Sequence, residues 1–332
     1  MDISPLPETP PPAHWGLLRD EVLALRKLFG YWHQDTAQTL SPSSDLPAYL
    51  GHALPGSTMS DVLLVAFDVD TKHSYETLAN DQEFHIGISI LDTRSVHDYI
   101  LAPAPYKVET AIQSYQFNVG DSKYIRRVAR NFLFGDAEAI QLVDLESKFE
   151  NLTVGRQMIL VFHGGSASDW KIFQGLQLDQ QPLFVLETVK AAQHPLRLSY
   201  RWSLEKLLDT FHIPFAALHA AGNGAHFFLR ALAMIAVKDA ESRPDGAADD
   251  AWVQAMTDIA RLQLPARPEP GPTADEIRHQ DNQEAKERRK AKRAAKIERR
   301  RREREDRSFA SISADPDLDE ALPPAITEHC SA

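Results

Sequence analysis

Two aspartates, Asp68 and Asp70, end a short apolar run that begins at Val62. The run is rich in Val and Leu and is followed by polar residues, which is typical of a buried strand. Because side chains alternate along a strand, the two carboxylates should point to the same face at its C-terminal end. A divalent cation would relieve their repulsion, since such ions bind hard oxygen ligands. Asp is also a common turn residue, and the pair alone favours an ordinary turn after a strand.

A third carboxylate and a histidine occupy comparable positions further along the chain. A helix should begin near Ser166 or Ser168 after another apolar run, which places Asp169 in the first helical turn near the end of a strand. Asp169 could instead only complement the helix dipole. His219 opens a small-residue loop before a helix predicted at 225–237. A single histidine in a loop is usually just a surface residue, so His219 becomes informative only together with the carboxylates.

A cluster of basic residues follows in the segment 123–130. If this segment is helical, its four cations lie on one face, at positions i, i+3, i+4 and i+7. Such a face could bind a phosphate backbone, although a solvated surface helix explains the pattern equally well. The four cations are Lys123, Arg126, Arg127 and Arg130.

The elements that would position these residues indicate an α/β fold. The first two strands are joined by a polar loop, 71–81, and are compatible with an antiparallel hairpin. The segment 104–122 is expected to be irregular. We predict strands at 62–70, 83–92, 158–162 and 182–188, and helices at 15–32, 203–211 and 225–237.

The composition changes along the chain and divides it into six parts. The central part carries most of the apolar periodicity, whereas the two ends are rich in Pro or in charge. The predicted parts are a disordered leader (1–13), an N-terminal helix with a connecting segment (14–60), a folded domain (61–238), a linker (239–275), a basic helix or tail (276–307) and a disordered C-terminus (308–332). Within the linker only 252–264 looks weakly helical.

The overall composition is that of a soluble intracellular protein. The chain has 332 residues, 43% of them hydrophobic, which is enough for a sizeable core. Cys330 is the single cysteine, so no internal disulfide framework exists and a reducing compartment is expected. The sequence has no apolar stretch as long as a membrane span, and the Pro-rich N-terminus is unlike a signal peptide.

The formal net charge of -11 hides an uneven distribution. The segment 286–307 contains 13 Lys or Arg against 5 Asp or Glu, a local charge of +8, and the rest of the chain carries -19. An acidic body with one strongly basic segment suggests a tail that contacts nucleic acid or acts as a nuclear address.

Several stretches between about 61 and 238, taken in order, resemble one known family. They are LLVAFDVD, EFHIGISILDT, NFLFGD, LVFHGGSASDWKIF, FVLET, SLEKLLDTFHI and HAAGNGAHFFLRAL. Their order and spacing resemble the DEDDh 3′–5′ exonucleases of the ribonuclease-H-like superfamily. Within it they are most similar to fungal proteins related to the yeast "good for full DEAD-box helicase activity" protein. The resemblance implies a ribonuclease-H-like mixed sheet flanked by helices.

The resemblance also implies roles for individual residues. Asp68 matches the first metal ligand of the family, Asp70 matches the family's Glu, and Asp169 matches the third carboxylate. His219 matches the general base. In the family two divalent ions, Mg²⁺ or Mn²⁺, align the attacking water and the leaving 3′ oxygen.

The departures from the family pattern affect the same site. Gly224 stands where the last Asp is due, and Ala220 stands where Asn is due. Asp70 is one methylene shorter than Glu, and Glu187 replaces an Asp often found in the following strand. Asn223 is adjacent to the missing carboxylate, but neighbouring helical residues are rotated by about 100° and point elsewhere.

These observations lead to three functional expectations. The first is a nucleic-acid-binding protein with a catalytically impaired domain and a vestigial His219, acting on RNA or DNA, in RNA metabolism. The second is an active exonuclease in which Asn223, a water or a substrate phosphate replaces the last carboxylate. The third is a non-catalytic scaffold with protein partners reached through the tail. No membrane or small-molecule cofactor is expected, and the predicted location is nuclear, cytoplasmic or both.

Overall fold

The computed structural model describes the chain at 16–31, 46–71, 78–79, 82–164, 166–176, 178–243, 251–266 and at residue 290. The chain divides into two units, Met1–Ala266 and Arg267–Ala332. The predicted leader, the C-terminus after 307 and all of the basic segment except Lys290 lie outside the described residues. The same holds for most of the loop 71–81. The fold is therefore that of the first unit.

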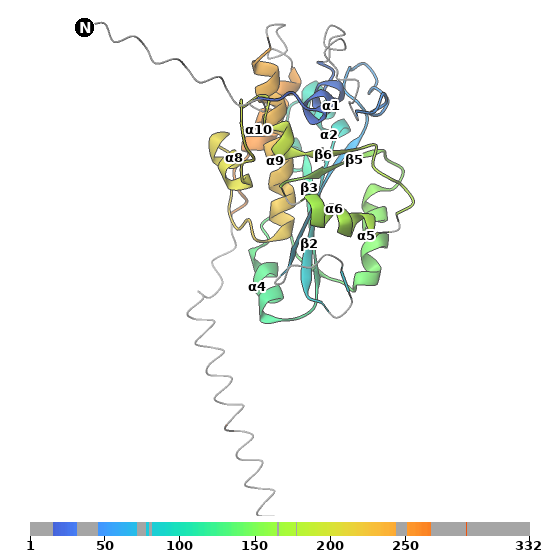
Figure 1. The fold of residues 1–332 in the computed structure, drawn as a ribbon, viewed down its shortest axis with the longest axis vertical. Coiled ribbons are helices and arrows are strands. Elements are labelled where there is room, and N and C mark those ends of the chain that lie inside the picture. The colour runs from blue at the N-terminus through green and yellow to red at the C-terminus, as the bar shows by residue number, and fades with distance from the viewer. Residues whose placement is uncertain are drawn as a thin grey trace, which may run out of the picture. The chain divides into compact units, whose positions relative to one another are not determined.

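A six-stranded mixed sheet forms the centre of this unit and confirms the expected α/β class (Figure 1). The strand order is β4-β3-β2-β1-β5-β6. The pairs β1–β2 and β2–β3 are antiparallel, which confirms the predicted hairpin, whereas β5 runs parallel to both β1 and β6. The strands are β1 Leu63–Thr71, β2 Phe84–Asp92, β3 Ile112–Val119, β4 Glu138–Ala139, β5 Met158–Phe162 and β6 Phe184–Glu187.

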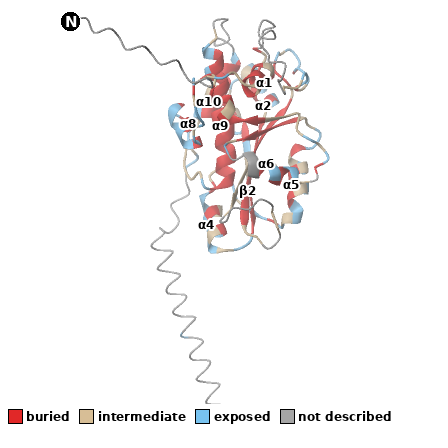
Figure 2. Cartoon of the chain, in the orientation of Figure 1, coloured by how far each residue is buried: buried red, intermediate tan, exposed pale blue. Residues whose placement is uncertain are grey.

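Helices cover both faces of the sheet. The long helix α9 (Ala221–Glu241) lies along one face and is buried over almost its whole length (Figure 2). Helices α5 and α6 belong to the opposite side of the sheet (Figure 1). Within the described residues no helix is both long and apolar enough to cross a membrane. The other helices are α1 Asp20–Leu28, α2 Thr93–Leu101, α3 Pro105–Glu109, α4 Lys123–Asn131, α5 Leu145–Thr153, α6 Ser166–Gln174, α7 Thr188–Ala191, α8 Leu204–Thr210 and α10 Ala251–Arg261.

Strand β1 is apolar on both faces because each face is covered by a core of its own. Leu64 and Ala66 pack into the cluster that contains α9, whereas Val65 and Phe67 pack into the cluster on the α5–α6 side. Side chains alternate along a strand, so Asp68 continues the row that faces α9. The last carboxylates of β1 are thus directed towards the N-terminal turn of this helix.

Two predictions about secondary structure are wrong. The segment 104–122 is not irregular, because it contains α3 and the whole of β3. The strand was hidden by polar side chains that are buried, such as Gln116 and Asn118, which leave little apolar alternation to detect. Helix α9 also begins at Ala221, four residues earlier than predicted. The small residues of this turn allow it to pack directly on the sheet.

The linker predicted at 239–275 contains a helix of the core. Helix α10 buries its apolar side, and Trp252 stacks on Phe29 at 5.1 Å and on Tyr31 at 4.9 Å between ring centroids. This helix confirms the weakly helical stretch at 252–264, which the sequence places inside the linker. The folded body therefore extends at least to Arg261.

Candidate functional site

Four carboxylates gather at one edge of the sheet. Strands β1, β5 and β6 run parallel, so their carboxyl ends meet at the same edge. Asp68 and Asp70 end β1, Asp169 lies in the first turn of α6 after β5, and Glu187 ends β6. The structure thus brings together the three predicted carboxylates and adds a fourth.

The pKa values show that these groups influence one another. Burial raises the pKa of Asp68 well above its usual value, and the charges of Asp169 and Asp70 raise it further. Burial also raises the pKa of Asp169 to about 7, with additional contributions from Glu187 and Asp70. Both effects arise because like charges held in a poorly solvated place oppose ionisation. The site therefore carries less negative charge near neutral pH than four ordinary carboxylates would.

Glu187 belongs to this cluster, although the sequence identifies it only as a departure from the family pattern and not as a site residue. Its side chain is buried, and Oε1 accepts a hydrogen bond of 2.6 Å from the Gly164 backbone N–H. Oε2 is buried and has no hydrogen-bond partner among the residues that the structure describes. The sequence signal for Glu187 is its position at the end of an apolar strand. Asp70 has the same kind of position at the end of β1.

The position of the missing fourth family carboxylate, Gly224, is filled by another residue of the site. A Cβ built on Gly224 would lie 2.0 Å from Oδ2 of Asp68 and 3.1 Å from its Cγ. Helix α9 comes this close because Gly87, which pairs with Asp68 across β1 and β2, has no side chain either. A Cβ on Gly87 would lie 1.9 Å from the carbonyl oxygen of Ala221. Any side chain at 224 would therefore displace the Asp68 carboxylate.

Asn223 does not replace the missing carboxylate, which corrects one of the expected alternatives. Its Oδ1 accepts a hydrogen bond from the Leu133 N–H at 2.9 Å. Its Nδ2 donates to the carbonyls of Asn131 at 2.8 Å and Ala217 at 3.0 Å. The amide is fully buried and holds the end of α4 against the start of α9. Its polar atoms are thus engaged away from the carboxylates.

A histidine and a tyrosine that the sequence did not single out flank Asp70. The Ala221 N–H donates to Nδ1 of the buried His85 at 3.2 Å, so the neutral ring carries its proton on Nε2. That Nε2 lies 3.0 Å from the hydroxyl oxygen of Tyr124 and 3.9 Å from Oδ2 of Asp70. Burial lowers the pKa of His85 to about 4, which keeps the ring neutral at physiological pH.

His219 is exposed at the same edge. The pKa of Asp70 is raised by burial, and the charge of His219 is one of the influences that oppose this rise. The structure therefore places the predicted general base beside Asp70, and its role in proton transfer stays a prediction.

Helix α4 carries the predicted basic face next to this edge. Lys123, Arg126, Arg127 and Arg130 are all exposed, whereas Ile125 and Val128 face the core. Arg126 binds Asp121 at 3.2 Å. Burial and the charge of Asp70 raise the pKa of Tyr124, on the same helix, to about 12, while Arg127 opposes this shift. A cationic surface and the carboxylate edge are thus neighbours.

The arrangement fits a bound metal only in its donor chemistry. Exonucleases of the DEDDh type generally use divalent ions, and carboxylate oxygens suit Mg²⁺ or Mn²⁺. In the described part of the chain, however, no three His, Cys, Asp or Glu side chains are grouped so that they could hold an ion. The residues as they stand do not form the expected metal centre.

A search among curated proteins found no match, whereas a comparison with protein-family models agrees with this architecture. The family model DEDDh_C, described as DNA polymerase III subunit epsilon-like, C-terminal domain, matches residues 63–235, which is more than half of the chain. The match runs from the first residue of β1 into α9 and so includes all four carboxylates and Gly224. The chain therefore belongs to the DEDDh_C family of DNA polymerase III subunit epsilon-like C-terminal domains.

Proposed function

We propose that this protein binds nucleic acid through an exonuclease-like domain whose catalysis is impaired. The observation that carries the proposal is the contact at Gly224. The Asp68 carboxylate occupies the place where a fourth carboxylate on α9 would begin. A two-metal mechanism holds its ions about 4 Å apart and depends on the full set of ligands. Loss of one ligand, with its space already filled, supports an inactive or weak site with His219 as a vestigial base.

The binding function is supported by the position of α4. Its exposed cations suit the phosphate groups of a single strand, and Tyr124 ties the helix to His85 beside Asp70. A strand that runs over α4 would therefore pass the carboxylate edge. We infer RNA or DNA as the partner, with a role in RNA metabolism in the nucleus, the cytoplasm or both. The sequence resemblance to the fungal relatives of the yeast protein supports this role, and the basic segment 276–307 adds positive charge.

The test measures the binding of labelled single-stranded RNA and DNA to the full chain at several salt concentrations. We expect the double substitution Arg127→Gln and Arg130→Gln to weaken binding. It should also reduce the slope of log K against log salt by about 1.4, because each phosphate contact on a single strand contributes roughly 0.7. The matched control, Lys148→Gln with Lys238→Gln, removes two charges from α5 and α9 and should leave the slope unchanged. Absence of salt-dependent binding would instead favour the scaffold.

One observation favours residual exonuclease activity as a second candidate. Glu187 offers a fourth carboxylate at the end of β6, and its buried Oε2 has no hydrogen-bond partner among the described residues. The assay is digestion of a 3′-labelled strand with Mg²⁺ or Mn²⁺. Our proposal predicts little or no digestion. Metal-dependent digestion that disappears in both Asp68→Ala and Glu187→Gln would overturn it in favour of the active enzyme.

A further inference from the structure

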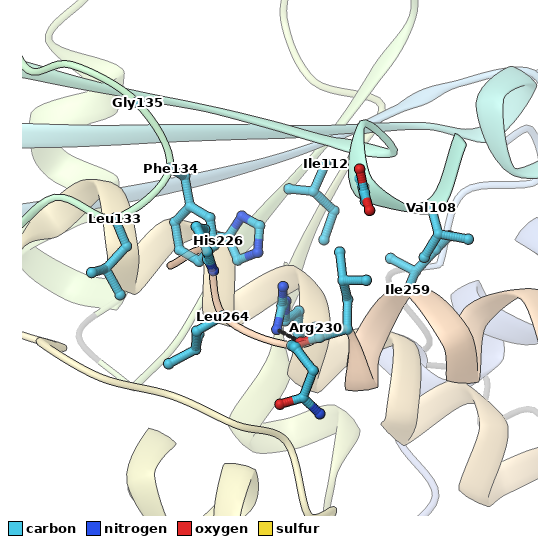
Figure 3. Close-up of a pocket in the computed structure, with 13 residues that line it drawn as sticks. Val108, Ile112, Leu133, Phe134, Gly135, His226, Arg230, Ile259 and Leu264 are labelled. Carbon is cyan, nitrogen blue, oxygen red and sulfur yellow. Dashed lines mark hydrogen bonds between the residues drawn. The ribbon is translucent and has the colours of Figure 1, made fainter. Parts of the chain in front are cut away.

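A cavity of about 560 Å³ lies beside α9, and none of the four carboxylates lines it. This volume is within the range of about 300–1,000 Å³ that is usual for small-molecule sites. Its walls come from four places in the chain: the start of β3 with the α3 that precedes it, the segment that follows α4, helix α9, and the end of α10. Figure 3 shows the side chains of these four regions converging on one space.

Arg230 is the charged group of this cavity. It is 1% exposed, its Nη1 donates a hydrogen bond of 2.7 Å to the Leu262 carbonyl, and its buried Nε has no partner among the described residues. No ion pair of Arg230 is present in that part of the chain. Burial lowers the pKa of its guanidinium to about 10, so the group remains charged at neutral pH. A buried cation without a counter-ion is costly, and an anion in the cavity would relieve that cost.

His226 supplies a second unsatisfied polar atom one helical turn earlier. Its Nδ1 lies 2.8 Å from the Ser114 hydroxyl, whereas Nε2 is buried without a partner in the described residues. The ring stacks on Phe134 with 3.5 Å between centroids and 13° between planes. Figure 3 shows these two rings face to face, with Arg230 nearby. Stacking on Phe134 and the contact with Ser114 fix the orientation of the imidazole. Its Nε2 therefore keeps its position in the cavity lining.

A purely structural role explains only part of this arrangement. The hydrogen bond from Arg230 to Leu262 satisfies a carbonyl just beyond α10, and a guanidinium has five N–H donors. The remaining walls are mostly apolar, including Val108, Ile112 and Ile259. Glu109 also lines the cavity, but it is exposed and makes no ion pair with Arg230. The cavity thus combines one buried cation, one fixed imidazole and an apolar body of space.

We propose that this cavity binds a small organic monocarboxylate, whose acid group contacts Arg230 and His226 and whose apolar body lies against Phe134 and the aliphatic walls. A monoanion matches the single formal positive charge of the site. A planar carboxylate also matches the fork of a guanidinium, which binds it with two parallel hydrogen bonds. The site is separate from the proposed nucleic-acid surface and does not depend on it.

The experiment uses the full chain, with isothermal calorimetry and thermal denaturation as readouts. The probes are benzoate, 4-phenylbutyrate and octanoate, each compared with its neutral amide, together with phenyl phosphate. We expect at least one carboxylate to bind saturably and raise the melting temperature, and its amide to bind at least about tenfold more weakly because the charge contact is lost. Equal binding of acid and amide, or no binding by any of the three acids, would overturn the proposal. Preference for phenyl phosphate would overturn the assignment to carboxylates.

Variants locate the binding to this cavity. Arg230→Gln should weaken the best acid by at least about tenfold, and Leu264→Trp should block it by filling the cavity, while Lys238→Gln on the exposed side of the same helix should change nothing. If Arg230→Gln fails to fold, Leu264→Trp and the acid–amide comparison decide. Unchanged affinity in a folded Leu264→Trp variant would place the acid elsewhere and refute the site.

Discussion

At the scale of single residues, the contact between Gly224 and Asp68 sets the geometry of the carboxylate edge. Gly224→Ala should destabilise the protein by about 1–3 kcal/mol, because its methyl group would force the Asp68 carboxylate from its place. In an Asp68→Ala background the same change should be neutral or stabilising, since alanine is about 1 kcal/mol better than glycine within a helix. Urea denaturation of the four proteins of this cycle measures the effect. The same sign in both backgrounds would contradict the contact.

The raised pKa of Asp169 predicts a pH dependence of stability. The folded state holds this proton up to about pH 7, whereas an unperturbed Asp loses it near 3.8. The stabilisation that this residue contributes is therefore fully present below about pH 4 and is lost as the pH rises through 7. The wild type loses this stabilisation as the pH rises from 4 to 8, whereas Asp169→Asn does not. The free energy of unfolding of Asp169→Asn should therefore rise relative to that of the wild type over this range, by on the order of 1–4 kcal/mol.

Denaturation of Asp169→Asn and wild type, side by side at pH 4, 6 and 8, tests this dependence. Comparing the two proteins at each pH removes the contribution of titrating groups that do not interact with Asp169. Among these is His85, whose lowered pKa acts in the opposite direction, because its stabilisation is lost as the pH falls towards 4. A difference between the two proteins that does not vary with pH would show that Asp169 titrates normally.

The residue types of the site could be predicted from the sequence, but several of its contacts could not. Strand ends and helix starts mark Asp68, Asp70 and Asp169, since their positions depend on local chain geometry alone. The contact between Asp68 and Gly224 depends on how closely α9 packs on β2. The approach of His85 to Asp70 depends on the pairing of β1 with β2, in which these two residues are direct partners. Neither relation is encoded in the spacing of residues along one element.

At the scale of elements, the N-terminal turn of α9 is held by Asn223. Asn223→Ala removes three hydrogen bonds to the backbone at Leu133, Asn131 and Ala217, and should destabilise the protein by about 1–3 kcal/mol. Asn223→Asp should be at least as harmful, because a carboxylate cannot donate to the two carbonyls. It should not create metal affinity, since this side chain faces away from the carboxylates.

Thermal denaturation and calorimetric titration with Mg²⁺ and Mn²⁺ measure the two effects separately. Asn223→Ser is a useful comparison, because a hydroxyl keeps part of the hydrogen bonding. If Asn223→Asp gained metal affinity without loss of stability, Asn223 would have to reach the carboxylate edge, against the contacts observed here.

Elements with strong apolar periodicity were predicted well, and elements with buried polar groups were not. The hairpin of β1 and β2 and the helix α8 follow from apolar periodicity, and α8 has Ser203 as its N-cap. Strand β3 was not predicted because its inward residues include polar ones: Gln116 donates to Asn118 within the strand and accepts from the Gly222 N–H of α9. Helix α10 coincides with the stretch 252–264 that looks weakly helical in the sequence, but its packing on α2, which is distant in the chain, does not follow from the sequence pattern. Tertiary context, which a sequence pattern does not contain, decides such elements.

At the scale of the whole folded unit, helices outside the family segment complete the core. Arg26 on α1 forms a fully buried bidentate pair with Asp239 near the end of α9, at 2.7 and 2.8 Å. Arg26→Met should cost about 3–5 kcal/mol, because it leaves the buried Asp239 carboxylate without its guanidinium and with His194 Nε2 at 4.0 Å. Chemical denaturation measures this loss.

The double substitution Arg26→Met with Asp239→Leu provides the control. Removing both charges eliminates the unpaired group, so the double variant should recover much of the lost stability. If the double variant were no more stable than Arg26→Met alone, packing around Arg26 and not its charge would account for the effect.

The stack of Trp252 on Phe29 and Tyr31 also has a consequence for how the protein is made. These rings are separated by more than 200 residues of chain, so the contact cannot form until translation has passed α10. At about 5–20 residues per second, the ribosome needs roughly 10–40 s to cover that interval. During this time α1 has left the ribosome with its apolar side uncovered. The nascent chain therefore completes its core late, and a stop in synthesis before Trp252 leaves an aggregation-prone product.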